Sequence, residues 1–316
     1  MARNISRKVF LRWGTGLTGS VLLKPFTGNT KIAGNNQNMQ TKHPVLRTIP
    51  SSGEKIPAIG MGTWLTFDAG NSESKRKELK EVLRIFWENG GKLIDSSPMY
   101  GSSEKVVGDL ITDLKFKKIF LATKVWTNGE ANGISQMQQS FQKMQTARMD
   151  LMQVHNLVDA EIHLKTLRKW KAEGKIRYIG ITHYLVNAYP ELMQLIKNEK
   201  PDFVQFNYNM AVRDAEKKLL PFCADTGIAV INNRPFDGGD LFRRINGKTL
   251  PSWTKDYDIR NWAQFFLKYI ISHPAVTCAI PATSKQSHMH ENIGALYGSL
   301  PDPAARNKMA DFFDKL

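Results

Sequence analysis

Residues 150–182 decide the fold of this chain, and they read DLMQVHNLVDAEIHLKTLRKWKAEGKIRYIGIT. A short apolar run at residues 150–155 is followed by a segment whose apolar residues recur at helical spacing and which ends at Gly174. A second apolar run follows at residues 177–182. Runs of this length and β-branched content are typical of parallel strands that are buried on both faces. The stretch therefore predicts one strand–helix–strand unit.

The same alternation extends from residue 56 almost to the end of the chain. Eight apolar runs span residues 57–62, 92–95, 119–124, 150–155, 177–182, 203–207, 228–231 and 276–280. No Gly-x-Gly-x-x-Gly follows the first run, as a dinucleotide-binding doubly wound sheet would require. Eight strand–helix units in about 240 residues fit an α/β fold of the (β/α)8 TIM barrel type better than an open sheet.

A hairpin is expected before the barrel. Residues 46–49 and 55–56 flank the turn-like sequence Ser51-Ser52-Gly53-Glu54, which predicts an N-terminal β-hairpin outside the barrel. Such a hairpin could plug the N-terminal mouth. A short C-terminal helix is expected from about Pro303.

The composition is that of an ordinary globular protein: 316 residues, 41% hydrophobic and 23% charged. Two cysteines, Cys223 and Cys278, exclude a disulfide framework and do not support a metal site. The net charge is +15, and residues 1–40 hold six basic and no acidic residues. The other basic residues are scattered, which favours solvated helix faces and predicts no nucleic-acid partner.

The N-terminus resembles a twin-arginine export signal. Residues 6–12 read Ser-Arg-Lys-Val-Phe-Leu-Arg, with Lys8 in place of the second arginine, and a mildly apolar run follows at residues 13–23. That run is shorter than the roughly 20 residues of a transmembrane helix, so no stable membrane span is expected. We predict a signal and linker at residues 1–40, a barrel at residues 41–316, the twin-arginine machinery as a partner, and a periplasmic or exported location. The alternative is a basic tail on a cytoplasmic protein.

Four polar residues are expected to meet at one mouth of the barrel. Asp95, Lys124 and His155 end the second, third and fourth strands, and Tyr100 follows Asp95 by five residues. In barrels of this type the active site lies at the C-terminal ends of the strands. Tyrosine can act as a general acid near neutral pH only if its pKa is brought down, which an adjacent ammonium would do. The set therefore predicts a proton donor, Tyr100, assisted by Lys124, with Asp95 pairing the buried lysine. His155 can either donate to a substrate oxygen or relay a proton to the tyrosine.

The chain closely resembles the aldo-keto reductases from about residue 46 to residue 300. The matching motifs are Gly60-Met61-Gly62-Thr63-Trp64, residues 93–101 with Glu104, Ala122-Thr123-Lys124-Val125, and residues 150–156. The resemblance implies a barrel that binds NAD(P)H and transfers hydride to a carbonyl carbon, with Asp95, Tyr100, Lys124 and His155 as the catalytic residues.

The resemblance also implies a set of cofactor-binding residues. Gly62, Thr63 and Asp95 would lie near the nicotinamide ribose beside Trp64. Gln205, Thr182 and His183 would contact the carboxamide. The adenosine-phosphate segment would be Ser284, Lys285, His288, Glu291 and Asn292, where a loop and helix start offer N–H groups to phosphate and Lys285 or His288 could hold a 2′-phosphate.

The chain departs from the family pattern at three places. Thr182-His183 replaces a frequent Ser-Asn pair, and Asn233 or Arg234 stands where an aromatic ring usually stacks on the nicotinamide. Arg234 could instead contact the pyrophosphate or an anionic substrate. Ala282 and His288 replace a frequent lysine and arginine, so NADPH is the expected cofactor and NADH remains possible.

The substrate is not specified by the sequence beyond a small or aromatic aldehyde or ketone. Trp64, Phe67, Met99, Trp126 and Tyr184 follow strand ends and could line an apolar pocket, and the long connection at residues 237–256 could fold over it. We predict an NADPH-dependent reductase of aldehydes or ketones. The alternative is a nicotinamide-binding sensor or accessory protein on the same barrel.

Overall fold

The computed structural model describes residues 43–316, so the signal and linker predicted for residues 1–40 lie outside the described part. A sheet of eight parallel strands forms in the order β10-β9-β8-β7-β6-β5-β4-β3. The strands are β3 (Met61–Gly62), β4 (Leu93–Asp95), β5 (Phe120–Val125), β6 (Met149–His155), β7 (Ile176–His183), β8 (Phe203–Asn207), β9 (Ala229–Asn233) and β10 (Cys278–Ala279). All eight predicted strands are therefore confirmed.

The first and last strands meet and close the barrel. Single backbone bridges join Ile59 to Ala279 and Gly62 to Ala282, and the Gly62 N–H donates to the Pro281 carbonyl at 3.1 Å. A Cβ at Gly62 would lie 2.9 Å from the Ile280 carbonyl oxygen, so this close approach requires glycine. Both strands are shorter than predicted because these contacts are isolated bridges rather than a continuous ladder. The predicted (β/α)8 barrel is confirmed.

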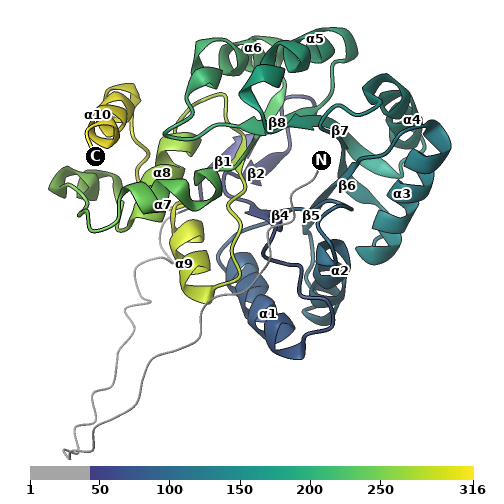
Figure 1. The fold of residues 1–316 in the computed structure, drawn as a ribbon, viewed down its shortest axis with the longest axis horizontal. Helices are drawn as coiled ribbons and strands as arrows, with labels where there is room; N and C mark the ends of the chain where they lie inside the picture. Colours follow the sequence, from purple (N-terminus) through teal and green to yellow (C-terminus); the bar gives the residue numbers. More distant parts are fainter. Residues whose placement is uncertain (1–42) are drawn as a thin grey trace, which may run out of the picture. The chain divides into compact units, whose positions relative to one another are not determined.

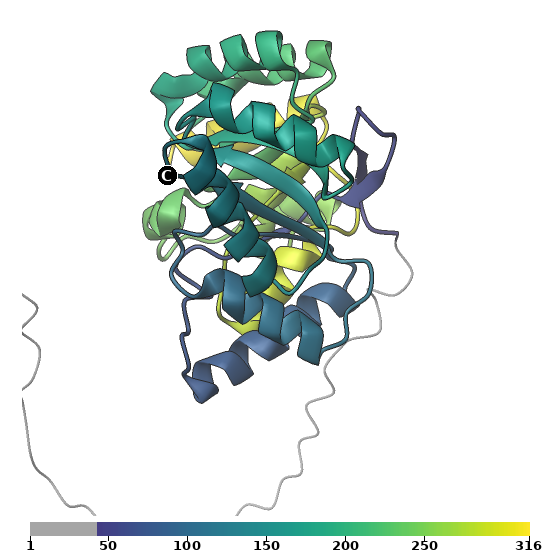
Figure 2. The ribbon, with the colours of Figure 1, turned by 90° about the vertical axis from the view of Figure 1, so that its right-hand side faces the viewer.

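The predicted hairpin covers the N-terminal end of the barrel. Strands β1 (Leu46–Thr48) and β2 (Lys55–Pro57) pair antiparallel, and they lie at one end of the barrel in Figure 2. Ile49 and Ile56 are buried in one cluster with apolar residues that begin the barrel strands, such as Phe120 and Phe203. The hairpin therefore plugs this end with apolar side chains, as predicted.

Helices surround the barrel (Figure 1). They are α1 (Glu73–Glu88), α2 (Ser103–Asp113), α3 (Glu130–Lys143), α4 (Ala160–Ala172), α5 (Tyr189–Glu199), α6 (Leu219–Thr226), α7 (Asp240–Arg244), α8 (Trp262–Ile271), α9 (Gln286–Gly294) and α10 (Pro303–Asp314). Short 3-10 segments are η1 (Val186–Ala188), η2 (Asp214–Lys217), η3 (Asp237–Gly239) and η4 (Ser252–Tyr257).

The helix ends follow from local sequence. Helix α1 buries Leu79, Val82, Leu83 and Phe86 on one face. Helix α10 begins at Pro303 as predicted, and the Asp302 side chain caps it by accepting the Ala305 N–H at 2.7 Å.

Among residues 43–316, no helix has both the length and the apolar character needed to cross a membrane.

Candidate active site

The ends of the barrel strands build a polar layer above the apolar interior. Side chains alternate along a strand, so Phe120, Ala122 and Lys124 of β5 point to the same side. Phe120 and Ala122 belong to the apolar interior cluster. The strand register then sets Lys124 beside Gln153 and His155 beside Thr182. The layer at the C-terminal mouth consists of Asp95, Lys124, Gln153, His155, Thr182, Gln205 and Asn233.

Asp95 is the hub of this layer. Its Oδ2 accepts a hydrogen bond from Lys124 Nζ at 2.5 Å, and its Oδ1 accepts from Gln153 Nε2 at 2.8 Å and Gln205 Nε2 at 3.1 Å. Lys124 Nζ also donates to the Ser96 carbonyl at 2.6 Å. Both members of the ion pair are buried. A buried pair is tolerated only when its remaining hydrogen-bonding groups are satisfied, which this arrangement achieves.

Tyr100 and His155 face each other beside the ion pair. The Lys124 ammonium lies 5.1 Å from the centroid of the Tyr100 ring. The rings of Tyr100 and His155 are nearly perpendicular, with centroids 6.2 Å apart. Ser97 Oγ lies 3.5 Å from His155 Nδ1, which leaves Nε2 for a substrate oxygen. The structure thus brings the four predicted catalytic residues together.

The charges of these groups follow from burial and from their neighbours. Burial raises the pKa of Tyr100 above its ordinary value, although the Lys124 ammonium lowers it. Lys124 therefore lowers the Tyr100 pKa, as predicted. The prediction that this pKa is lowered overall is wrong, because burial raises it by more than Lys124 lowers it. Burial lowers the pKa of Lys124, but Asp95 and Tyr100 raise it above its ordinary value overall. Burial and the nearby Lys124 lower the pKa of His155 to about 3, so its imidazole is neutral near pH 7.

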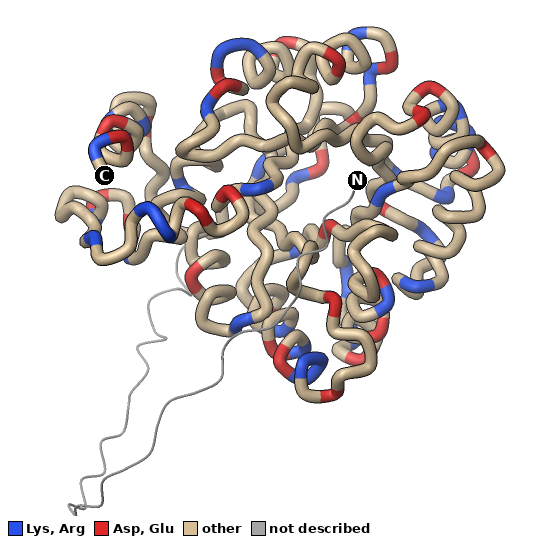
Figure 3. The backbone as a smooth tube through the Cα atoms, in the orientation of Figure 1, with Lys and Arg blue, Asp and Glu red and all other residues tan. Residues whose placement is uncertain are grey.

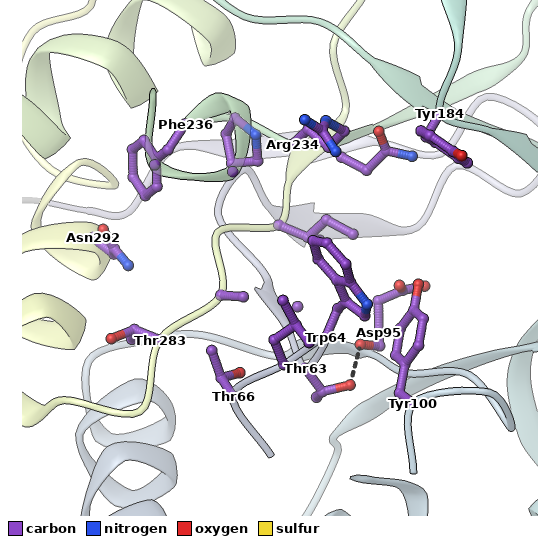
Figure 4. Close-up of a pocket in the computed structure, with 18 of the residues that line it drawn as sticks. Thr63, Trp64, Thr66, Asp95, Tyr100, Tyr184, Arg234, Phe236, Thr283 and Asn292 are labelled. Carbon is purple, nitrogen blue, oxygen red and sulfur yellow. Dashed lines mark hydrogen bonds between the residues drawn. The ribbon is translucent and has the colours of Figure 1, made fainter. Parts of the chain in front are cut away.

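A cavity of about 1210 Å³ opens above these residues. Figure 4 shows Trp64, Asp95 and Tyr100 on one side, Tyr184 and Arg234 across from them, and Thr283 and Asn292 toward the other end. Trp64, Met99, Trp126 and Tyr184 line the catalytic end as predicted, and each is 40–46% exposed. Phe67 is a correction: it is fully buried in the core and does not line the cavity. The catalytic end therefore has an aromatic and apolar rim.

The other end of the cavity is lined by polar and aromatic side chains. Thr283, His288, Glu291 and Asn292 line it, with Phe236, Phe242 and Trp262 from the segments after β9. Phe242 belongs to α7, so the predicted long connection does reach over the site. Gly62, Thr63, Thr182 and Gln205 line the floor between the two ends. Asn156 and Asn233 each hold a buried side-chain oxygen that has no hydrogen-bond partner among the described residues. Unsatisfied oxygens in a cavity wall fit a ligand that carries N–H or O–H donors.

Three of the predicted cofactor residues lie outside the cavity wall. Ser284 and Lys285 precede α9 without lining the cavity, and Lys285 is exposed. His183 also lies outside it: its ring stacks on Tyr184 and its Nδ1 accepts the Leu185 N–H at 3.1 Å. The reason is strand alternation, because Thr182 faces the barrel interior and the next residue must face away. The roles of His183, Ser284 and Lys285 in cofactor binding stay predictions, and this geometry does not favour them.

The last residue of β9 and the residue that follows it are polar, where an aromatic ring was expected. Asn233 Nδ2 donates to Gln205 Oε1 at 3.4 Å, and Arg234 lines the cavity while pairing with Asp237 at 3.1 Å. Arg234 has a φ of 51°, in the left-handed region that arginine rarely occupies. Asn233, which follows Ile231 on the interior face, is therefore the residue that takes the place of the ring, and Arg234 follows at the rim.

Sequence reasoning missed several residues that support the site. Gln153 and Ser97 contact Asp95 and His155 as described above, and Asn156 lines the cavity. Glu104 is buried behind the site and accepts the Thr123 hydroxyl at 2.6 Å, while burial raises its pKa. Gln153 occupies an inward position two residues before His155, so strand alternation could have identified it.

Comparisons with known proteins agree with this geometry. A model of the aldo/keto reductase family matches residues 58–305. Methylglyoxal reductase YeaE of Escherichia coli (strain K12) is 31% identical over 259 residues, covering 79% of this chain and 89% of that protein. Aldo-keto reductase YhdN of Bacillus subtilis (strain 168) is 29% identical over 240 residues, covering 70% of each.

Solved structures give the same result. The crystal structure of an aldo-keto reductase from Klebsiella pneumoniae in complex with NADPH superposes with a TM-score of 0.71 at 26% identity, covering 85% of this chain and 95% of that chain. A second structure from the same organism, in complex with NADP and acetate, gives a TM-score of 0.69 over 83% of this chain and 93% of that chain, also at 26% identity. The family model, the relatives and the geometry of the mouth agree: the chain belongs to the aldo/keto reductase family.

Proposed function

We propose that the chain reduces an aldehyde or a ketone to an alcohol with NADPH, and that Tyr100 is the proton donor. Family membership makes it an oxidoreductase. One observation carries the proposed chemistry: the Tyr100 phenol, the buried Lys124–Asp95 pair and the His155 imidazole converge on one cavity. The bound nucleotides of the two Klebsiella structures support NADPH as the cofactor, with NADH as the alternative.

The residues of the chain have separate tasks in this reaction. Bound NADPH supplies the hydride for the carbonyl carbon. Neutral His155 donates an N–H to the carbonyl oxygen and orients it, since its pKa of about 3 excludes an imidazolium near pH 7. Tyr100 delivers the proton to the same oxygen. Lys124, held by Asp95, opposes the effect of burial on the Tyr100 pKa and so keeps the phenol a usable acid.

The cofactor would lie along the cavity from the Asp95 layer to α9. Gln205 and Asn233 would hold the carboxamide, with Gly62 and Thr63 beside the ribose. Asn156 and Asn233 offer the unsatisfied oxygens. His288, Glu291 and Asn292 would face the adenosine phosphate. Arg234 lies between the two ends and can contact the pyrophosphate.

As far as residues 43–316 describe it, the substrate end has two charged side chains at its wall: Asp95, which Lys124 neutralises, and Arg234, which pairs with Asp237. Its aromatic rim of Trp64, Trp126 and Tyr184 fits a neutral, partly apolar carbonyl compound. The relatives named methylglyoxal reductase and glyoxal reductase support a small carbonyl compound as the substrate.

An absorbance assay tests the proposal. Purified protein mixed with NADPH and a panel of aldehydes and ketones should oxidise the cofactor with at least one of them, and faster than with NADH. A sensor or accessory protein would instead bind NADPH tightly and oxidise it with none of them. The complete set of Asp95, Tyr100, Lys124 and His155 favours the enzyme.

We also propose that residues 1–40 direct export by the twin-arginine pathway to the periplasm, ahead of a barrel at residues 41–316. The sequence from Ser6 to Arg12 supports this proposal. Replacing Arg7-Lys8 with Gln-Gln should retain the protein in the cytoplasm of fractionated cells. An unchanged distribution would reject the signal and leave the cytoplasmic alternative.

A further inference from the structure

We infer that the end of the barrel opposite the active site docks on an anionic phospholipid surface through a patch of lysines around an aromatic pair. This lysine–aromatic patch consists of Lys92, Lys115, Lys117 and Lys118 with the rings of Trp87 and Phe116. Over the outer helices, by contrast, Lys and Arg alternate with Asp and Glu (Figure 3).

The patch is assembled from two neighbouring connections. Trp87 lies at the end of α1 and Phe116 between α2 and β5, and their rings stack with centroids 4.7 Å apart at 14°. The Phe120 N–H donates to the Lys92 carbonyl at 3.0 Å, which joins the connection before β4 to the one before β5. Both connections enter barrel strands, so they lie at the N-terminal end. The patch is therefore remote from the Tyr100 mouth.

The four lysines are exposed, and no ion pair holds them among residues 43–316. Nearby carboxylates are already used: Glu88 pairs with Arg84 at 2.7 Å and Asp113 pairs with Lys80. Trp87 is 38% exposed. An indole between water and apolar contacts, surrounded by lysines, is the combination that proteins place at membrane interfaces.

The rest of this end carries the same sign. Lys55, Arg148 and Lys200 are exposed there and have no ion pair among the described residues. The acidic side chains of the hairpin and the strand-entering connections are paired with cations of their own: Glu54 and Asp150 with Arg177, Glu173 with Lys175, Glu199 with Arg168, and Asp202 with Lys171. Exposed Asp225 at the end of α6 is the exception within residues 43–316.

A flat phospholipid surface is favoured over nucleic acid because Trp87 and Phe116 cover each other's faces instead of leaving both open for bases.

Vesicle sedimentation of the full chain tests the inference. The wild type is expected to bind vesicles that contain phosphatidylglycerol and not pure phosphatidylcholine, and 0.5 M salt (roughly a 4 Å screening length) should release it. The triple variant Lys115→Gln, Lys117→Gln, Lys118→Gln should bind at least about tenfold more weakly. The matched control Lys165→Gln, Lys248→Gln, Lys255→Gln removes three exposed lysines elsewhere and should bind like the wild type.

Three outcomes would overturn the inference. They are no binding of the wild type to phosphatidylglycerol, equal weakening in the patch and control variants, and tighter binding to duplex DNA than to vesicles. NADPH oxidation with the best substrate of the panel should be the same in the wild type and both triple variants, because none of these lysines lines the cavity. If the chain reduces no carbonyl at all, equal melting temperatures show that the variants fold, and the vesicle result still decides the inference.

Discussion

The two ends of the barrel interior use the same strands for opposite purposes. At the N-terminal end, Phe120, Phe203 and Ile56 pack into a dry apolar cluster beneath the hairpin. At the C-terminal end, Lys124 and Gln205 continue the same inward rows of β5 and β8, but they hold a network around Asp95. Inward-facing residues only two positions apart on one strand therefore serve either the stability of the barrel or the chemistry of the site. Substitutions at one end should change stability, and substitutions at the other end should change activity.

The largest effect is expected from Tyr100→Phe. The substitution removes only the hydroxyl that donates the proton, so kcat should fall by about 10² to 10⁴. Stability should change little, because the ring is kept and Lys124 Nζ keeps its hydrogen bonds to Asp95 and the Ser96 carbonyl. Steady-state NADPH oxidation and thermal melting measure the two quantities. Activity within about tenfold of the wild type would remove Tyr100 from the role of acid.

A substitution at the N-terminal end of the barrel should instead lower stability and leave substrate binding unchanged. Phe203 is fully buried and packs edge-to-face against Phe120 and Tyr178, with centroids 6.1 and 5.5 Å away. Phe203→Ala should lower the free energy of unfolding by about 3–5 kcal/mol and leave the KM for the carbonyl unchanged. Denaturant unfolding measures the loss. Leu65→Ala, at an exposed position of the mouth, is the control that should not change stability.

Asn233→Tyr should strengthen NADPH binding, and this effect should be smaller than the two above. The new ring would replace a hydrogen-bonding side chain by one that can stack on the nicotinamide, which is worth about 0.5–1.5 kcal/mol. The Kd for NADPH, followed by protein fluorescence, should therefore fall roughly two- to tenfold. Asn246→Tyr, on the exposed segment after α7, is the matched control. Weaker NADPH binding in Asn233→Tyr alone would show that the hydrogen bonds of Asn233 outweigh stacking.

The smallest expected effect is that of pH. Burial keeps the His155 pKa at about 3, and burial raises the Tyr100 pKa above its ordinary value despite Lys124. Neither group changes its charge between about pH 5 and pH 9, so kcat/KM for reduction should be nearly flat in that window. It should fall only as the phenol ionises at higher pH. A step near pH 6.5 that disappears in His155→Gln would contradict the assignment.

Much of the fold was predictable because its signals are local. The eight apolar runs, the hairpin turn at Ser51–Glu54 and the Pro303 helix start each lie within a few residues of sequence. The lengths of β3 and β10 were not predictable, because their bridges depend on the closure of the barrel. Closure joins residues that are more than 200 positions apart, and no local pattern records it.

The site was predictable to the same extent. Asp95, Lys124 and His155 end strands and could be placed at one mouth by topology alone. Strand alternation also places His183 outside the barrel interior and Gln153 inside it. The sequence analysis instead assigned His183 to the cofactor and did not include Gln153. The net shift of the Tyr100 pKa required its burial, which depends on the surrounding loops rather than on its own motif.

Product stoichiometry tests the central claim most directly. The wild type and Tyr100→Phe are each loaded with NADPH and given the best carbonyl of the panel, and the alcohol formed is measured against the NADPH consumed. The wild type should form one alcohol per NADPH, and Tyr100→Phe should bind NADPH equally well but form almost no alcohol. NADPH consumption without alcohol, or alcohol formed equally well by Tyr100→Phe, would contradict it.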